Sequence, residues 1–359
     1  MYEHALVIGK FYPPHRGHHH LVRSAARVAA RVSVVVMASA AESIPLAERV
    51  SWMRRSHAGD ANVTVTGIAC DAPLDLEATP VWAAQVACMK AAVRQIDATP
   101  VDAVVSSEKY GDELARWFTA THVCADPDRV EYPISGTDCR AGLADRWDWL
   151  DEPARAGLAT RIVVLGAEST GTTTVSRAVA QRYRDRGGVW SRTGWVPEYG
   201  RQATHDKLAR LRSVQPGAPV EALTWTGDDF ARIAGEQART EEAAARAGSP
   251  VLICDTDAFA TTVWERRYLG PGGGRAWEGV ADRRALYLLT DHVGVPFVQD
   301  GIRDGEHVRA EMTGWFEDAL TATGRSWVLL TGSLEERVEV AVRVVDQALA
   351  QRSSFSAPL

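Results

Sequence analysis

The chain has 359 residues, a formal net charge of −6 and 46% hydrophobic residues, and this length suggests two ordinary domains. Residues 1–152 carry 20 acidic and 15 basic side chains, and residues 153–359 carry 26 and 25. Neither half is basic, which argues against nucleic acid as a partner. No apolar run approaches the roughly 20 residues that span a bilayer, and neither a signal peptide nor a CxxC spacing occurs. We therefore expect a cytoplasmic protein without a membrane partner.

The first half alternates strand-like apolar runs with amphipathic stretches. Strands are expected at 5–8, 32–37, 63–68, 103–105 and 122–125, and helices at 17–30, 46–57, 81–96 and 111–118. This alternation predicts an α/β fold with a parallel, Rossmann-like sheet that binds ligands at the carboxyl ends of its strands. We place this domain at 1–152 and expect residues 147–157 to connect it to the next.

A second alternating series predicts another parallel sheet, in a domain at 158–352. Its strands are expected at 162–165, 195–198, 250–255, 284–289 and 327–330, and its helices at 172–186, 228–247 and 335–351. Residues 270–274 are expected to form a flexible loop and residues 353–359 a frayed tail.

Each series opens with a glycine-rich turn between a strand and a helix, the context in which backbone N–H groups bind phosphate. The first turn, residues 9–18, fits the GxFxPxHxGH form of the nucleotidylyltransferase superfamily. Its two histidines, His15 and His18, lie three residues apart, so both are expected to face one phosphate chain. Residues 134–140 resemble the ISxTxxR element of the same superfamily. The residues expected to bind ATP through these two elements are Gly9, Phe11, Gly17, Ser135 and Thr137.

This first site suits adenylyl transfer. A phosphate oxygen that attacks the α-phosphorus of ATP is already ionised, so it needs alignment and charge compensation rather than a general base. The groups expected to compensate the charge of the leaving pyrophosphate are a Mg²⁺ ion and the cationic side chains of Lys10, His15, His18 and Arg140.

The second turn, residues 166–174, fits the P-loop pattern GxxxxGK[ST] except that Thr172 stands where the pattern requires lysine. This replacement removes a charge-assisted contact to the β and γ phosphates. Arg303, in a segment at 300–303 that suits a mobile lid, is the expected substitute for the missing lysine. The sequence gives no geometric reason to place Lys207 near the phosphates. The other P-loop residues expected to bind ATP are Gly166, Ser169, Gly171, Thr172 and Thr173.

Acidic residues end two of the predicted strands. Asp255 follows an apolar run as a Walker B carboxylate should, so Asp255 or Asp257 is expected to order Mg²⁺ together with the Thr173 hydroxyl. Glu198 is expected to accept the proton of a substrate hydroxyl that attacks the γ-phosphate.

Aromatic rings are the expected binding surface for a flat, cationic heteroaromatic group, because such a group is attracted to their faces. The candidates are Trp82 in the first half and Trp264 or Tyr268 in the second. Tyr199 and Asp257 complete the residues expected to touch the substrate.

In their order and spacing, these motifs resemble the NadR family of bifunctional nicotinamide-nucleotide adenylyltransferases and ribosylnicotinamide kinases. The resemblance implies that the first domain converts ATP and nicotinamide mononucleotide into NAD and pyrophosphate. It also implies that the second domain phosphorylates nicotinamide riboside with ATP. The implied partners are therefore small-molecule nucleotides. The resemblance leaves open whether the chain forms a homo-oligomer.

Thr172 leaves one alternative, a monofunctional adenylyltransferase whose P-loop domain senses nucleotide without catalysis. A second alternative is a nucleotidylyltransferase for a different phosphate substrate. Some family members also carry an N-terminal DNA-binding domain. Because the first strand is predicted to start by residue 5, a transcriptional role is not expected.

Overall fold

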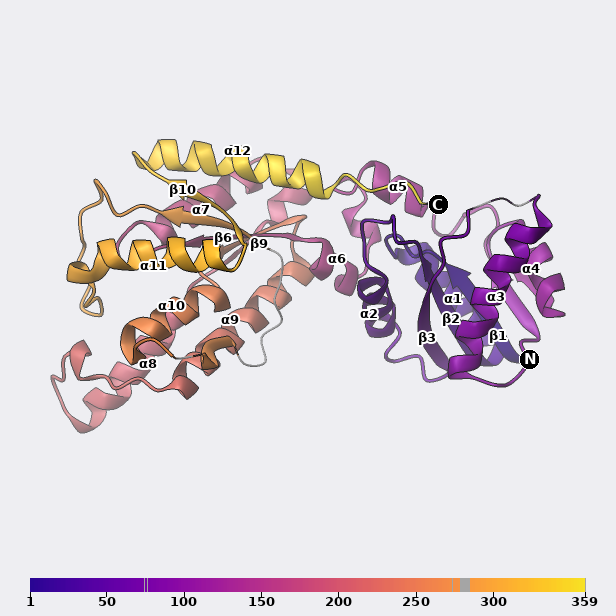
Figure 1. Ribbon diagram of the computed structural model, residues 1–359, viewed down its shortest axis with the longest axis horizontal. Helices are drawn as coiled ribbons and strands as arrows, with labels where there is room; N and C mark the ends of the chain where they lie inside the picture. Colours follow the sequence, from indigo (N-terminus) through magenta and orange to yellow (C-terminus); the bar gives the residue numbers. More distant parts are fainter. Residues whose placement is uncertain (74, 76, 273, 278–284, 359) are drawn as a thin grey trace. The chain divides into compact units, whose positions relative to one another are not determined.

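The computed structural model describes residues 1–73, 75, 77–272, 274–277 and 285–358. The chain forms two compact units, each with a five-stranded parallel sheet (Figure 1). The first unit comprises Met1–Leu158 together with Ser353–Leu359, and the second comprises Ala159–Arg352. The prediction of two α/β domains with parallel sheets is therefore confirmed.

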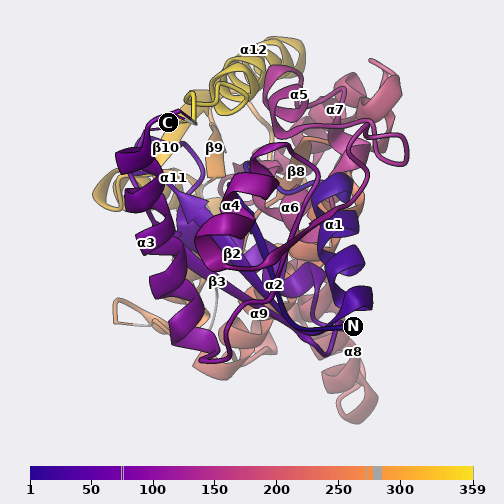
Figure 2. The same cartoon turned by 90° about the vertical axis from the view of Figure 1, so that its right-hand side faces the viewer.

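The sheet of the first unit has the strand order β3-β2-β1-β4-β5. Its strands are β1 (Tyr2–Gly9), β2 (Ala29–Ala38), β3 (Val63–Ala69), β4 (Ala103–Ser106) and β5 (Thr121–Cys124). Apolar residues on both faces of β1 are buried, as in strands covered by helices on either side. Helices α1 (Arg16–Val28) and α2 (Leu46–Ser56) pack on one face, and α3 (Thr79–Ile96) and α4 (Tyr110–Phe118) pack on the other (Figure 2).

The connection expected at 147–157 is largely helical. After β5 come α5 (Gly136–Ala141), the short 3-10 helix η1 (Trp147–Trp149) and α6 (Glu152–Leu158), all in the first unit. Trp147 is fully buried, and a Cβ atom on Gly157 would lie 2.3 Å from the Trp52 ring, so α6 packs tightly on α2. The expected frayed tail also differs from the structure, because its described residues 353–358 pack on the first unit.

The sheet of the second unit has the strand order β10-β9-β6-β8-β7. Its strands are β6 (Thr160–Leu165), β7 (Gly194–Val196), β8 (Val251–Asp255), β9 (Ala285–Thr290) and β10 (Ser326–Leu330). Helices α7 (Thr172–Arg184) and α12 (Leu334–Arg352) cover one face, and α9 (Gly227–Ala247) and α10 (Ala258–Leu269) lie on the other (Figure 1). Residue 284, the expected start of one strand, and Gly273 of the expected loop lie outside the described residues.

Three long helices of the second unit were not expected: α8 (Tyr199–Val214), α10 and α11 (Arg309–Ala322). The shorter 3-10 turns are η2 (Gly188–Arg192), η3 (Val220–Ala222), η4 (Arg275–Trp277) and η5 (Glu306–Val308). No helix among the described residues is long and apolar enough to cross a membrane. In each sheet the chain continues from the central strand, β1 or β6, first toward one edge of the sheet and later toward the other edge. In folds of this kind, ligands bind in a crevice at the carboxyl end of the central strand.

Candidate active sites

The two histidines of the first motif lie together at the carboxyl end of β1. His15 is the N-cap residue of α1, and its backbone N–H donates to Nδ1 of His18 at 3.3 Å. The two imidazole rings are stacked, with centroids 3.7 Å apart. A Cβ atom on Gly17 would lie 3.2 Å from the His15 ring, a tight contact that glycine avoids. The sequence-predicted pair is thus brought together on one turn of helix.

Burial makes these histidines neutral. It lowers the pKa of His15 to about 3, and the electrostatic interactions of His15 with His19 and Arg129 add to this effect. Burial also lowers the pKa of His18 well below its usual value. Both rings are therefore neutral here, whereas the cationic state expected for them in contact with the pyrophosphate of ATP stays a prediction. Both ring nitrogens of His15 are buried without a hydrogen-bond partner among the described residues.

Lys10 is held by a buried carboxylate. Its Nζ lies 2.9 Å from Glu42 Oε1, and Arg49 Nη2 lies 2.6 Å from Glu42 Oε2. Burial alone would raise the pKa of Glu42, but the hydrogen bonds from Lys10 and Arg49 lower it. Glu42 therefore stays ionised and fixes both cations beside the loop that carries the histidines.

Arg140 joins the second predicted element to the first. Its guanidinium donates to the Tyr12 carbonyl oxygen at 2.7 Å and to Thr137 Oγ1 at 3.0 Å, and it lies over the Tyr12 ring. A Cβ atom on Gly136 would lie 3.3 Å from that carbonyl oxygen, so glycine lets α5 approach the loop closely. Residues 134–140 and 9–18 therefore form one site.

The remaining predicted residues of the first unit have mainly structural contacts. Ser135 is the N-cap of α5: its Oγ accepts from the Asp138 N–H at 3.1 Å and donates to Asp138 Oδ2 at 2.6 Å. Phe11 is buried and packs edge-on against His18, and a Cβ atom on Gly9 would lie 3.2 Å from the Phe11 ring. Trp82 is packed in the hydrophobic core with other residues of α3.

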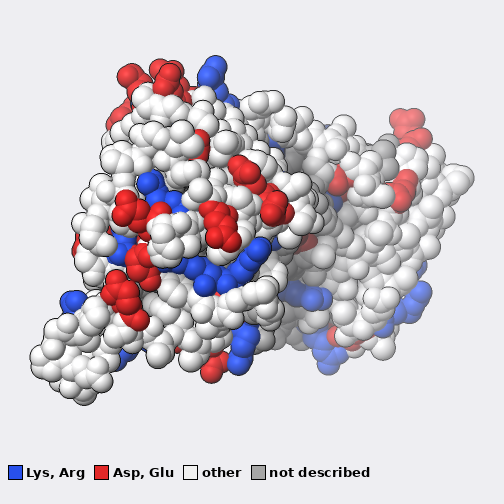
Figure 3. Space-filling model, turned by 60° about the vertical axis from the view of Figure 1, so that its left-hand side comes forward, with Lys and Arg blue, Asp and Glu red and all other residues white. Residues whose placement is uncertain are grey.

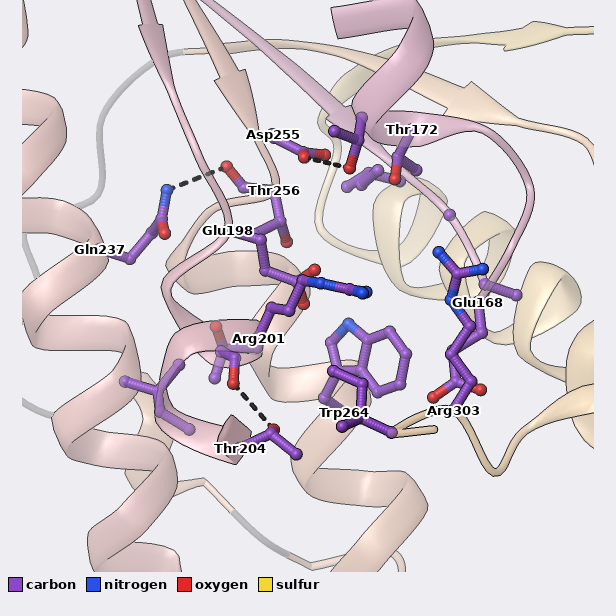
Figure 4. A pocket seen from close by; sticks show the side chains of 18 of the residues that line it. Glu168, Thr172, Glu198, Arg201, Thr204, Gln237, Asp255, Thr256, Trp264 and Arg303 are labelled. Carbon is purple, nitrogen blue, oxygen red and sulfur yellow. Dashed lines mark hydrogen bonds between the residues drawn. The ribbon is translucent and has the colours of Figure 1, made fainter. Parts of the chain in front are cut away.

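The second site is a pocket at the carboxyl ends of β6 and β8 (Figure 4). Charge of both signs is interleaved on the face of the second unit that stands in the foreground of Figure 3. The sequence-predicted residues that line the pocket are Gly166, Ser169, Thr172, Thr173, Glu198, Asp255, Trp264, Tyr268 and Arg303.

The P-loop threonines contact the carboxylate at the end of β8. Thr173 Oγ1 donates to Asp255 Oδ2 at 2.5 Å, and Thr172 also hydrogen-bonds to Asp255. Asp255 is 2% exposed, and burial raises its pKa although both hydroxyls oppose this shift. The residue that replaces the lysine therefore adds a second hydroxyl to the Asp255 carboxylate and contributes no charge.

Glu198 has the properties of a general base. It precedes α8, and its side chain points into the pocket (Figure 4). Burial and the nearby Asp255 carboxylate raise its pKa to about 7, while Arg201 opposes the shift. A carboxylate with this pKa is half ionised near neutral pH, where proton transfer from a hydroxyl is most effective.

Two arginines converge on the pocket from opposite sides. Arg201 forms an ion pair with Asp300, whose carboxylate also lies 3.3 Å from Arg303 Nε. Figure 4 shows the Arg201 guanidinium pointing toward Trp264 and the Arg303 guanidinium lying beside Glu168. The hydrogen bond from Arg201 helps to lower the pKa of Asp300 against the effect of burial. Asp300 thus holds two cations near the P-loop that lacks its own.

The segment that bears Arg303 is attached to the P-loop itself. Ser169 Oγ accepts from the Val298 N–H at 2.9 Å and from Arg303 Nη1 at 3.3 Å. Glu168 accepts from the Gly305 N–H at 2.7 Å and from Arg267 at 3.1 Å. These contacts place the predicted lid segment directly over the phosphate-binding turn.

Aromatic side chains form one wall of the pocket. Trp264 and Tyr268, both predicted, come from α10, and they are joined by Trp225 and Phe230. The ring centroids of Trp225 and Tyr268 are 5.7 Å apart, and those of Trp225 and Phe230 are 5.6 Å apart. Four aromatic side chains therefore line this side of the pocket.

Sequence reasoning missed several lining residues, including Arg201, Thr204, Trp225, Phe230, Gln237 and Thr256. Thr256 has a φ of 69°, which is rare for a β-branched residue and is typical of functional sites. Its carbonyl oxygen accepts from Gln237, whose side-chain oxygen accepts from the Tyr199 N–H at 3.0 Å. Gln237 thus ties the turn after Asp255 to the start of α8.

Three predicted residues lie outside the pocket lining. Gly171 is the N-cap of α7 with a φ of 91°, a conformation that favours glycine. Tyr199 begins α8. Asp257 is the N-cap of α10, where its carboxylate accepts from the Ala260 N–H and from the Tyr287 hydroxyl, both at 2.8 Å. These buried contacts direct Asp257 away from the ligand space.

Two family models match the chain, one in each unit. The cytidylyltransferase-like model matches residues 6–142, and the AAA domain model matches residues 161–337. Two curated relatives are the trifunctional NAD biosynthesis/regulator proteins NadR of Salmonella typhimurium strain LT2 and Escherichia coli strain K12. Each is 21% identical over 314 residues, which covers 83% of this chain and 71% of the relative.

Solved structures show the same fold along the whole chain. The crystal structure of NadR in complex with NR covers 96% of this chain and 96% of its own, with 18% identity and a TM-score of 0.65. The crystal structure of NadR in complex with NAD and AMP-PNP covers 100% of this chain and 98% of its own, with 19% identity and the same TM-score. This chain is therefore NadR-like in sequence, and it joins a cytidylyltransferase-like domain to an AAA domain.

Proposed function

We propose that this chain makes NAD in two ATP-dependent steps. The second unit phosphorylates nicotinamide riboside, and the first unit transfers the adenylyl group of ATP to the resulting mononucleotide with release of pyrophosphate. The observation that carries the proposal is the pocket of the second unit, where a carboxylate with a pKa of about 7 faces a P-loop and a wall of aromatic rings. The NadR structures with NR, NAD and AMP-PNP support it.

In the second unit, Glu198 accepts the proton of the riboside hydroxyl as that oxygen attacks the γ-phosphorus. Its ionised form is present in about half of the molecules at pH 7, since its pKa is about 7. Trp264, Tyr268 and their neighbours stack on the pyridinium ring, because a cation is attracted to an aromatic face. This stacking aligns the hydroxyl with the phosphate.

Thr173 and Asp255 fit a Mg²⁺ ion. Both present oxygen atoms, the ligand type that Mg²⁺ prefers, and this ion usually takes only one or two protein ligands with water and phosphate completing its shell. Mg²⁺ held there would neutralise charge on the β and γ phosphates.

Arg303 and Arg201 take the place of the missing lysine. ATP phosphates carry the negative charge that Asp300 supplies to both guanidiniums in the free protein. Arginine is well suited to this substitution, because its planar guanidinium donates two parallel hydrogen bonds to phosphate oxygens.

In the first unit, the nucleophile is a phosphate oxygen, so neutral histidines suffice. His15 and His18 contact the phosphate chain as N–H donors, and their burial keeps those hydrogen bonds strong. Lys10 and Arg140 supply the positive charge that stabilises the departing pyrophosphate.

A second candidate function rests on Thr172. Because the P-loop has no lysine, the second unit can bind ATP as a regulatory signal without transferring phosphate. In that case the chain is an adenylyltransferase alone.

The test is product analysis with ATP, Mg²⁺ and nicotinamide riboside as the only organic substrates. NAD among the products establishes both reactions. If NAD forms only when nicotinamide mononucleotide is supplied, the second unit is a silent domain. If neither substrate yields NAD, the first unit acts on a different phosphate compound, which a panel of nucleoside monophosphates with pyrophosphate detection identifies.

A further inference from the structure

The chain's last described residues lie against the loop that carries the first motif. Residues 353–358 are part of the first unit. The Ser356 N–H donates to Ser43 Oγ at 2.7 Å, and its carbonyl oxygen accepts from the Tyr12 hydroxyl at 3.1 Å. The Phe355 ring meets the Tyr12 ring edge to face, with centroids 5.8 Å apart. The segment is thus fixed through both a ring contact and backbone hydrogen bonds.

Tyr12 is the point at which this segment reaches the reaction machinery. Its side chain is 1% exposed and lies between two guanidiniums, 4.8 Å from Arg49 and 5.2 Å from Arg140. Its hydroxyl accepts from the Ser43 N–H at 2.9 Å, and its carbonyl oxygen accepts from Arg140 at 2.7 Å. A shift of Tyr12 would therefore remove both a hydrogen bond and a ring contact from Arg140.

We propose that Phe355 and Ser356 support the adenylyl transfer site: they seat Tyr12 so that Arg140 is oriented for the phosphates of ATP before ATP binds. This inference rests on the proposed function of the first unit. Phe355 and Ser356 are positioning residues, because they touch Tyr12 and not the nucleotide-binding groups themselves.

The expected effect is on ATP binding. An arginine that is already oriented loses little side-chain freedom when it contacts phosphate, whereas a mobile one loses affinity as it becomes ordered. Loss of the segment's contacts should therefore raise the KM for ATP by roughly 3- to 10-fold. The kcat should change less than about twofold, because the ordered complex, once formed, is the same.

The experiment measures NAD formation from ATP and nicotinamide mononucleotide by the full chain. Phe355→Ala should raise the KM for ATP, and Phe355→Tyr should restore it, because the ring contact is retained. Ser354→Ala, at an exposed neighbouring position, is the matched control and should leave both constants unchanged. Thermal unfolding of each variant shows whether the fold is kept.

Arg140→Ala provides the decisive background. If the segment acts by orienting Arg140, then Phe355→Ala has no further effect on the KM for ATP once Arg140 is absent. An equal rise in both backgrounds, or an unchanged KM in the single variant, overturns the inference. Wild-type protein that makes no NAD from nicotinamide mononucleotide overturns the proposed function, and this inference with it.

Discussion

Burial shifts the pKa values of titratable groups in the two nucleotide sites in opposite directions. Burial in the first unit lowers the pKa of His15 to about 3 and keeps the imidazole neutral. Burial in the second unit raises the pKa of Glu198 to about 7, which makes this carboxylate a base of useful strength. The same desolvation thus produces a hydrogen-bond donor in one site and a proton acceptor in the other.

The difference follows from the nucleophile in each proposed reaction. A phosphate oxygen brings its own negative charge to the first site, whereas a hydroxyl must lose a proton in the second. Two phosphate-handling turns in one chain therefore need not share any catalytic group. Variants that affect one reaction and spare the other test this separation.

The largest effect is expected for Glu198→Gln. The amide keeps the size of the side chain but accepts no proton, so riboside phosphorylation should slow by about 10²- to 10⁴-fold. Steady-state assays of both reactions check this, and adenylyl transfer should keep its wild-type rate. A variant with unimpaired phosphorylation would contradict the role of Glu198.

The pH dependence should separate the sites next. Because Glu198 must be ionised and its pKa is about 7, phosphorylation should fall about tenfold for each pH unit below 7, with a slope of one. Adenylyl transfer should lack this limb. The same raised pKa has a consequence for stability. Ionisation of Glu198 should lower the free energy of unfolding as the pH rises from the pKa that Glu198 has in the unfolded chain toward 7 and above. Glu198→Gln should therefore be more stable than the wild type at pH 8, as measured by urea unfolding.

The arginines near the P-loop should show an intermediate effect. Removal of a charged hydrogen bond to phosphate by Arg303→Ala should lower kcat/KM for phosphorylation by roughly 10- to 100-fold. In a Thr172→Lys background the restored lysine supplies the same charge, so Arg303→Ala should cost much less there. Equal losses in the two backgrounds would show that Arg303 does not replace the lysine.

The smallest effect is expected at Ser135, whose hydroxyl caps α5. Ser135→Ala should destabilise this helix by about 1 kcal/mol, while Ser135→Thr keeps the capping oxygen. Thermal unfolding and the KM for ATP in adenylyl transfer measure the two contributions. A large loss of kcat in the alanine variant at unchanged melting temperature would mean that the hydroxyl contacts phosphate directly.

Local sequence signals were sufficient to predict both parallel sheets and both glycine-rich turns. A buried apolar strand, a glycine-rich turn and a helix leave a strong pattern, and the close approaches of Gly17 and Gly136 agree with it. The sequence also identified Glu198, Asp255 and Arg303 as residues that the structure gathers in one pocket.

Other parts of the sites leave little trace in sequence. Helix α8 buries only Ala203 and Leu208, so its helical periodicity is weak, and Arg201 was missed with it. The neutral state of His15 depends on burial by distant segments. The contacts of residues 353–358 join positions more than 300 residues apart, and a short segment without periodicity does not predict them.

The composition of the first unit has a consequence for any attempt to divide this protein. Because that unit takes residues from both ends of the chain, the second unit is inserted within it in sequence, and the backbone crosses between them twice. A fragment ending at residue 158 would lack Phe355 and Ser356, while a fragment starting at residue 159 would carry them without their partners. A fragment that keeps the contacts of Phe355 and Ser356 must therefore retain the terminal segment, so that excision of the second unit, and not truncation at residue 158, keeps the first unit whole.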